Sequence, residues 1–228
     1  MVRVFLLAGR CTWLAMATGT ALDECLQDYC NWDDAARARI RAYTLQLETT
    51  IVDKVAEAFG RLAPATLWAG EGVTGFAVNR RNNSEAEVSK ILARGEKPKG
   101  PVDHAIPVLA VKSRDGKWTA VLFGYACHTT TRSRYRWSGD FTGFAMIELQ
   151  RAHPGSQAMF FQGCGTDRNP IPRHTVELCE KYGKMLAKGV EETLRKPMRP
   201  LAPTLRWTRD LEERLDAAVE KVVAAVGK

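Results

Sequence analysis

Two apolar runs of this sequence end at polar clusters that could carry chemistry. The run Val121–Ala126 is followed by Cys127-His128-Thr129-Thr130-Thr131. The run Ala158–Phe161 is followed, after one glutamine, by Gly163-Cys164-Gly165-Thr166-Asp167-Arg168-Asn169-Pro170. In α/β proteins, binding sites usually form just past the carboxyl ends of buried strands. The sequence therefore predicts a site built from these two clusters.

His128 is the strongest single candidate for catalysis or metal binding. A neutral imidazole at the end of a strand can hold a metal ion or move a proton, and the alternative is a structural histidine that caps the strand. Asp140, in a Ser-Gly-Asp segment, could be a site carboxylate or the N-cap of a helix. His153 is expected to end that helix, and His104 and His174 are expected to be solvated in loops.

The second polar cluster could bind a ligand through its backbone and its side chains. Gly163 and Gly165 allow a ligand to approach backbone amide donors. Asp167, Arg168 and Asn169 add charge and hydrogen-bonding groups. A tight turn with an Asx cap would account for the same residues.

An arginine and two cysteines complete the set of candidate side chains. Arg80 follows a predicted strand in the segment NRRNN, where its guanidinium could clamp a carbonyl or carboxylate, although a solvated basic loop fits as well. Cys127 and Cys164 allow a thiol nucleophile. Adjacent residues of a strand point to opposite faces, so Cys127 is not expected to pair with His128.

The elements that must position these residues predict one α/β domain with a mixed β-sheet flanked by helices. A Gly-Glu-Gly turn is expected at 70–72, and Ser84 with Glu87 is expected to form a capping box. The helix that starts at the N-cap Asn31 shows an apolar stripe at spacings of three and four. The pattern predicts helices at 31–62, 84–94, 141–153, 176–195 and 211–226, and strands or extended segments at 66–69, 75–78, 106–112, 118–125, 158–161 and 199–208.

The composition is that of a globular protein with one large domain or two small ones. The chain has 228 residues, 45% of them hydrophobic, and a net charge of +7. Only the segment Arg132–Trp137 interleaves basic and aromatic residues, so no nucleic-acid partner is expected. The six cysteines show neither a CxxC pair nor zinc-finger spacing. No apolar run reaches the roughly 18 residues of a membrane span, and nothing indicates an oligomeric state.

Five segments, in this order, resemble the N-terminal catalytic domain of the neutral/alkaline non-lysosomal ceramidase family, especially its divergent bacterial members. They are APATLWAGEGVTGFAVNRR at 63–81, GPVDHAIPVLAV at 100–111, FGYACHTTT at 123–131, SGDFTGFA at 138–145 and FFQGCGTDRNPIPR at 160–173. The resemblance spans roughly residues 22–200. That family hydrolyses the amide bond of ceramide, a sphingolipid, with a catalytic zinc ion. The resemblance therefore implies a zinc-dependent hydrolase of lipid metabolism, with a small-molecule or lipid amide as substrate.

The resemblance also implies roles for individual residues. His128 matches a zinc-ligand histidine, and Arg80 matches the arginine of an Asn-Arg motif at the substrate site. Asp140 and Asp167 match recurrent acidic positions, and Asn169 stands where family members with a Gly-Asp-Val-Ser-Pro motif have serine. Zinc would activate water and polarise the amide carbonyl, while the arginine and loop amides stabilise the oxyanion. The implied catalytic residues are Arg80, Asp167 and Asn169, and the implied substrate-binding residues are Arg80, Gly163, Gly165 and Arg168.

The chain also departs from the family pattern. Residues 15–20 contain no histidine where the family carries a Thr-His-Ser-Gly-like segment with a further zinc ligand, and a catalytic zinc typically has about three protein ligands. The family's glutamate and tyrosine ligands lie beyond the region that matches this chain, so Asp140 or His174 would have to substitute. We therefore expect an incomplete ceramidase-like domain over residues 22–228 with impaired amide hydrolysis. The alternatives are a non-catalytic remnant that binds a ligand or partner, and a thiol-dependent hydrolase.

The first 21 residues form an atypical segment ahead of this domain. Residues 1–17 show neither strand alternation nor a helical stripe. They resemble a weak secretory signal whose apolar run is interrupted by Arg10. The family members are secreted or periplasmic, and this segment gives only weak support for the same location here.

Overall fold

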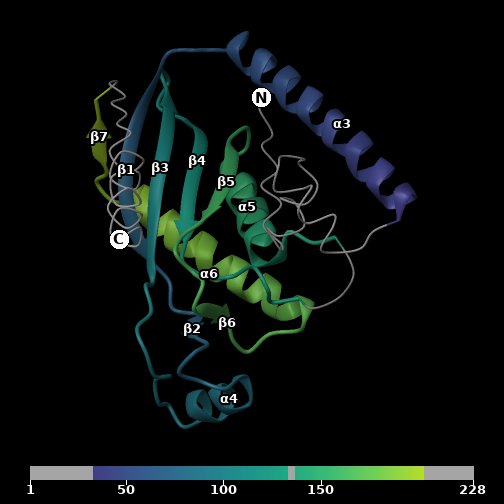
Figure 1. Ribbon diagram of the computed structural model, residues 1–228. Coiled ribbons are helices and arrows are strands. Elements are labelled where there is room, and N and C mark those ends of the chain that lie inside the picture. The colour runs from purple at the N-terminus through teal and green to yellow at the C-terminus, as the bar shows by residue number, and fades with distance from the viewer. Residues whose placement is uncertain (1–32, 133–136, 203–228) are drawn as a thin grey trace, which may run out of the picture.

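The fold is an α/β domain with a five-stranded mixed sheet and a separate two-stranded ribbon. The computed structural model describes residues 33–132 and 137–202, and Figure 1 shows their arrangement. Among the helices of these two ranges, none combines the length and the apolar character that a membrane crossing requires. The elements are α3 (Asp34–Phe59), β1 (Ala65–Val73), β2 (Ala77–Asn79), α4 (Glu85–Ala93), β3 (Ala105–Ser113), β4 (Trp118–Tyr125), α5 (Asp140–Ala152), β5 (Gln157–Gln162), β6 (Arg168–Pro170), α6 (Val176–Arg195) and β7 (Arg199–Leu201).

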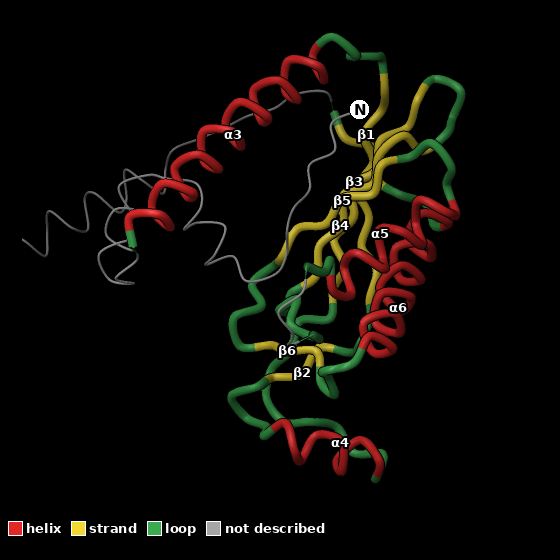
Figure 2. The backbone as a smooth tube through the Cα atoms, turned by 90° about the vertical axis from the view of Figure 1, so that its right-hand side faces the viewer, coloured by secondary structure: helices red, strands yellow, loops and turns green. Residues whose placement is uncertain are grey.

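The large sheet has the strand order β5-β4-β3-β1-β7. β4 and β5 pair in parallel, and the other neighbours pair antiparallel. The parallel pair requires a crossover, which α5 supplies between the two strands. Figure 2 shows α5 and α6 on the same side of the sheet, where they pack on each other and on the strands. The predicted fold class is therefore confirmed.

The core lies between the sheet and these two helices. Alternate residues of the central strands point inward, as the two-residue period of a strand requires. The helices contribute residues at spacings of three and four, which line one helical face. The buried side chains include Ile106, Val108 and Ala110 of β3, Val121, Phe123 and Tyr125 of β4, Phe141, Ala145 and Leu149 of α5, Ala158 and Phe160 of β5, and Tyr182, Leu186 and Val190 of α6.

The ribbon of β2 and β6 extends the molecule below the large sheet, and α4 lies beyond it (Figure 1). A small cluster of Val78, Val88 and Ile171 joins α4 to the ribbon. The guanidinium of Arg173 also donates to the carboxylate of Glu85 at 2.7–2.9 Å, which ties the segment after β6 to the first turn of α4.

One predicted turn is wrong. The Gly-Glu-Gly segment at 70–72 lies within β1, where Gly70 pairs with Val108 and Gly72 pairs with Ile106 of β3. These glycines instead allow α6 to approach the strand, because a Cβ atom on Gly72 would lie 2.6 Å from the carbonyl oxygen of Gly189. The two glycines that looked like a turn therefore serve the close packing of β1 against α6, which is distant in the sequence.

Several helix ends also differ from the prediction. α3 begins at Asp34 with Asp33 as its N-cap, whose carboxylate accepts from the amide of Ala36 at 2.6 Å. Ser84 is the N-cap residue of α4, but its hydroxyl donates to the carboxylate of Glu87 at 2.8 Å and makes no bond to a helix amide. The predicted N-cap Asn31, the segment 1–21 and the predicted helix 211–226 lie outside the described residues.

Candidate functional site

The two polar clusters after β4 and β5 lie against each other. The parallel register pairs Tyr125 with Gln162, so both chains leave the sheet at the same edge. The amide of Gly163 donates to the carbonyl of Tyr125 at 3.1 Å, and the amide of His128 donates to the carbonyl of Arg168 at 3.0 Å. A Cβ atom on Gly165 would lie 2.6 Å from the amide nitrogen of Cys127, so this approach requires glycine. The structure thus brings together the segments that the sequence singled out.

The backbone carbonyl of Thr166 holds two of the candidate side chains. Arg80 Nε donates to this oxygen at 3.0 Å, and His128 Nε2 lies 3.2 Å from it. The Arg80 amide also donates to the carbonyl of Asp167 at 2.8 Å, next to the ribbon pairing of Asn79 with Arg168. Arg80 and His128 therefore converge on one peptide unit, although they are far apart in the sequence.

The partners of His128 indicate its tautomer. A carbonyl oxygen only accepts hydrogen bonds, so Nε2 must carry the proton that points at Thr166. Nδ1 then accepts from the side-chain amide of Gln162 at a distance of 3.5 Å. This second contact is at the upper length limit for a hydrogen bond, so it is weak. Nδ1 is therefore the ring nitrogen that is more accessible to a ligand or a proton.

The acidic and basic side chains of the second cluster bind mainly to the protein itself. Asp167 Oδ2 accepts from Asn79 Nδ2 at 3.1 Å, and Asp167 Oδ1 lies 3.4 Å from Arg168 NH1. Arg168 NH1 also donates to the carbonyl of Cys164. Arg168 Nε is buried and finds no partner among the described residues. Asn169 is buried in β6, opposite Val78 of β2.

The glycine amides of this cluster are already engaged. Gly163 donates to Tyr125 as described above, and the Gly165 amide donates to the carbonyl of Gly163 at 2.7 Å. Neither amide is therefore available, in this conformation, as the oxyanion donor that the family resemblance implied. What the two glycines provide is the close approach between the loop and the end of β4.

Asp140 is a structural carboxylate. Gly139 is the N-cap of α5, and Asp140 is the first helical residue, with φ of 50°. Its carboxylate accepts from the amides of Thr131 (3.2 Å), Arg132 (2.9 Å) and Phe141 (2.8 Å). It is only 4% exposed. These bonds attach the threonine segment after His128 to the start of α5.

The other histidines also have structural partners. His174 Nε2 pairs with Glu85 Oε1 at 2.8 Å, and His153, the C-cap of α5, pairs with Glu191 Oε1 at 2.7 Å through Nε2. His104 was expected to be solvated, but it is half-buried and its Nδ1 lies 3.3 Å from the hydroxyl of Tyr125. Burial lowers the pKa of His104, which favours the neutral ring.

The described residues do not form a zinc centre by themselves. Within residues 33–132 and 137–202, no three histidine, cysteine, aspartate or glutamate side chains gather where they could hold a metal ion. His128 by itself resembles a metal-binding histidine, because such residues usually donate the ring N–H that faces away from the metal to a carbonyl or carboxylate, as Nε2 does here. It would supply only one ligand. The proposed substitutes have other partners: Asp140 binds three backbone amides and His174 binds Glu85.

The cysteines give little support to a thiol nucleophile. Cys127 is fully buried, and burial raises the pKa of its thiol well above the ordinary value. Its sulfur lies 3.7 Å from the backbone carbonyl of His128, not from the imidazole ring. Cys164 is exposed, and its carbonyl is the group that Arg168 binds. A thiolate at Cys127 is thus strongly disfavoured near neutral pH.

Sequence reasoning missed three groups that build this site. Gln162 and the Thr166 carbonyl hold His128, and neither has a sequence signature. Asn79 is 2% exposed and accepts from the amides of Arg81 and Asn82 through Oδ1 at 2.9 and 3.2 Å. This arrangement is an Asx turn, which the asparagine at the start of NRRNN could have indicated.

The fold defined here is also found in solved ceramidase structures. The neutral ceramidase from Pseudomonas aeruginosa is 16% identical, with a TM-score of 0.56, over 71% of this chain and 28% of that chain. A ceramidase complexed with C2 is 16% identical, with a TM-score of 0.58, over 71% of this chain and 27% of that chain. Neither a protein-family model nor a curated protein sequence matches this chain. The likeness shows the fold, and the chain spans somewhat more than a quarter of the ceramidase chains it matches.

Proposed function

We propose that this chain is a ceramidase-like hydrolase domain that acts on an amide bond, with Arg80 and His128 facing the substrate. The main support for this proposal is that Arg80 and His128 both contact the Thr166 carbonyl at the edge of the parallel strand pair. The fold likeness to neutral ceramidase supports the reaction class. The same likeness makes a lipid amide the substrate class to test first.

Arg80 is the residue that we assign to the substrate carbonyl. Its side chain is exposed, and Nε is anchored on Thr166. The two terminal nitrogens make no hydrogen bond to the described residues, so both can donate to a carbonyl or carboxylate oxygen. A donor fixed in advance stabilises the negative charge that develops on that oxygen during amide cleavage.

His128 supplies the second role. Because Nε2–H is held by Thr166, the neutral ring presents Nδ1 as a proton acceptor. It can take a proton from an attacking water once the long contact with Gln162 is released. Asp167 acts as a positioning residue, since its carboxylate holds Asn79 next to Arg80. Asn169 contributes through its place in the ribbon.

Hydrolysis of a short-chain fluorescent ceramide and of a simple N-acyl amide tests this function. We expect turnover by the wild type and a loss of about 10²–10³ in kcat for Arg80→Ala, the size of effect seen when an oxyanion donor is removed. Arg80→Lys should recover little, because an ammonium cannot both anchor and donate as the guanidinium does. Arg114→Ala, in the turn between β3 and β4, is the matched control. Absence of turnover, or equal rates for Arg80→Ala and wild type, would contradict the proposal.

Zinc remains a proposal that rests on the family resemblance, with His128 Nδ1 as a candidate ligand and with no complete set among the described residues. Elemental analysis of wild type, His128→Ala and His153→Ala tests it. Zinc that is lost only in His128→Ala would mean that residues outside the described ranges complete the site. Wild-type protein without zinc would leave this chain without a metal-dependent mechanism.

A non-catalytic binding role is the second candidate. The observation that favours it is that the site is internally satisfied: the glycine amides, Asp167 and Asp140 all bind protein groups. Saturable binding of an N-acyl amide that requires Arg80, without hydrolysis, would identify this role. The same variants therefore separate the two functions.

A further inference from the structure

A pocket of about 660 Å³ lies apart from the site described above. It is bounded by β2 and the segment that follows β6, by the end of α4 with the loop that follows it, and by the first half of α6. Its volume falls within the range of roughly 300–1,000 Å³ that small-molecule sites occupy. Arg80, His128 and the segment 163–169 do not line it. Whatever this pocket binds is thus held by residues to which the hydrolase proposal assigns no role.

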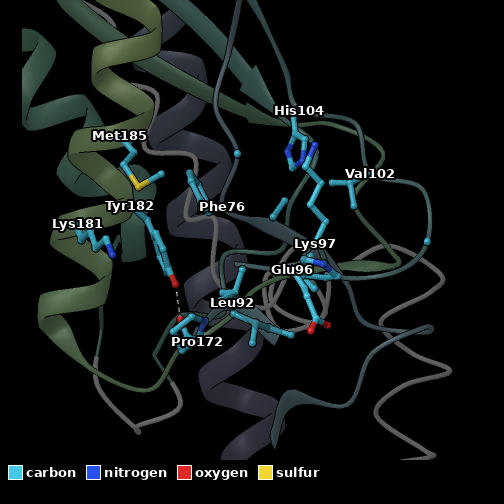
Figure 3. A pocket seen from close by; sticks show the side chains of 16 residues that line it. Phe76, Leu92, Glu96, Lys97, Val102, His104, Pro172, Lys181, Tyr182 and Met185 are labelled. Carbon is cyan, nitrogen blue, oxygen red and sulfur yellow. Dashed lines mark hydrogen bonds between the residues drawn. The ribbon is translucent and has the colours of Figure 1, made fainter. Parts of the chain in front are cut away.

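The walls of the pocket are mainly apolar. Figure 3 shows Phe76 and Tyr182 beside each other, with Met185 above Tyr182 on the same helix. The rings of Phe76 and Tyr182 stack with centroids 4.7 Å apart, and the Tyr182 hydroxyl donates to the carbonyl of Pro172 at 2.6 Å. These contacts fix one wall before any ligand arrives. The apolar lining consists of Phe76, Ala77, Val78, Leu92, Pro98, Val102, Ile171, Pro172, Tyr182 and Met185.

The charged residues of the pocket leave an excess of positive charge. Lys97 and Lys181 both line it and are exposed, and neither forms an ion pair with a described residue. Glu96 is the acidic residue of the lining, but its carboxylate is bound by Arg94 through Nε at 2.6 Å and NH2 at 3.0 Å. The two ammonium groups are thus free to bind an anion.

His104 adds a neutral polar group to this lining. The Tyr125 hydroxyl donates to the carbonyl of Thr74 at 2.9 Å, so its oxygen accepts from the amide of Ala77 and from His104 Nδ1. Nδ1 therefore carries the ring proton, and the ring itself is held in place. The positive charge of the pocket then comes from the two lysines and not from the histidine.

We propose that this pocket binds a compact amphipathic anion, namely an alkyl carboxylate of medium chain length. The carboxylate would lie at Lys97, and the alkyl chain would lie against Phe76, Leu92 and Met185, toward the side of the pocket where Figure 3 shows Lys181. Transfer of the chain from water to these apolar walls supplies most of the binding free energy. The excess positive charge of the lining selects an anionic head over a neutral or cationic one.

Isothermal titration calorimetry with decanoate below its micelle concentration tests this proposal. We expect saturable binding of one decanoate by the wild type, and roughly tenfold weaker binding by the double variant Lys97→Met, Lys181→Met. Butyrate should bind much more weakly than decanoate, because it buries less apolar surface. Decanol should also bind more weakly than decanoate to the wild type, since it lacks the charge.

Lys117→Met is the matched control, because Lys117 lies in the turn before β4 and pairs with Asp115 at 3.2 Å. Its affinity for decanoate should equal that of the wild type. The proposal is overturned if decanoate shows no saturable binding, if the double variant binds it as tightly as the wild type, or if decanol binds as tightly as decanoate. Arg80→Ala should leave decanoate binding unchanged, which keeps this result separate from the test of hydrolysis.

Discussion

The carboxylate of Asp140 joins the segment that follows His128 to the start of α5. It accepts from the amides of Thr131 and Arg132 on one side and of Phe141 on the other. Both oxygens are used, and the side chain is buried, so each bond replaces one that water would otherwise make. The chain after His128 is thereby attached to the first turn of α5.

We expect Asp140→Asn to destabilise the fold by about 1–3 kcal/mol. The asparagine side chain offers one acceptor oxygen, and its NH₂ group would face the amide of either Arg132 or Thr131. Urea unfolding followed by circular dichroism measures the change. Glu148→Gln on the same helix removes an exposed ion pair with Arg151 and should change the stability by less than about 1 kcal/mol. Equal stabilities for the two variants would show that the Asp140 carboxylate does not hold this loop.

Residue types alone were sufficient to single out Arg80 and His128 but not to explain how they are held. Both are side chains with distinctive chemistry, and each follows a predicted strand. The group that holds them, the Thr166 carbonyl, is present in every peptide and has no sequence signature. The same limit applies to the engaged amides of Gly163 and Gly165, whose partners depend on the pairing of β4 with β5.

At the scale of elements, α5 and α6 meet at a glycine. A Cβ atom on Gly183 of α6 would lie 2.8 Å from the carbonyl oxygen of Phe141, in the first turn of α5. By contrast, a Cβ atom on Gly143 of α5 would meet no atom within 4 Å. Both glycines are helical, and they differ in the space that neighbouring atoms leave for a Cβ atom.

This contrast predicts opposite effects for one substitution. Gly183→Ala should destabilise the protein by about 1–3 kcal/mol, because α6 must move away from α5. Gly143→Ala should stabilise it by up to about 1 kcal/mol, since alanine restricts the unfolded chain and favours the helix. Thermal unfolding of the two variants beside wild type measures both. A loss of stability in Gly143→Ala as large as in Gly183→Ala would mean that the close approach is not the cause.

The sequence predicted the elements better than their contacts. The bounds of α6 and of β4 match the prediction, because an apolar stripe and a run rich in apolar and aromatic residues are local signals. The turn at 70–72 was wrong, because two glycines near one another are typical both of a turn and of a strand under a closely packed helix. Only the position of α6 decides between these two, and no local pattern contains it.

At the scale of the whole molecule, α3 differs from every element of the core. Of its 26 residues, Thr44 alone is buried. Figure 2 shows the helix extending away from the sheet. Its predicted apolar stripe is present in the sequence, but Ile51, Val55 and Phe59 are 53%, 46% and 68% exposed. The periodicity thus predicted the helix, whereas burial depends on a partner surface that periodicity does not specify.

A helix with so few buried side chains should open without unfolding of the domain. We expect backbone amides of α3 to exchange with deuterium at least about tenfold faster than those of α6, after correction for the rates of the unfolded peptide. α6 contributes Tyr182, Leu186 and Val190 to the core, so its amides should exchange only when the whole domain opens. Hydrogen–deuterium exchange with mass spectrometry measures the two helices in one sample. Equal protection of α3 and α6 would show that a partner surface covers the stripe in solution, and that α3 belongs to the cooperative unit.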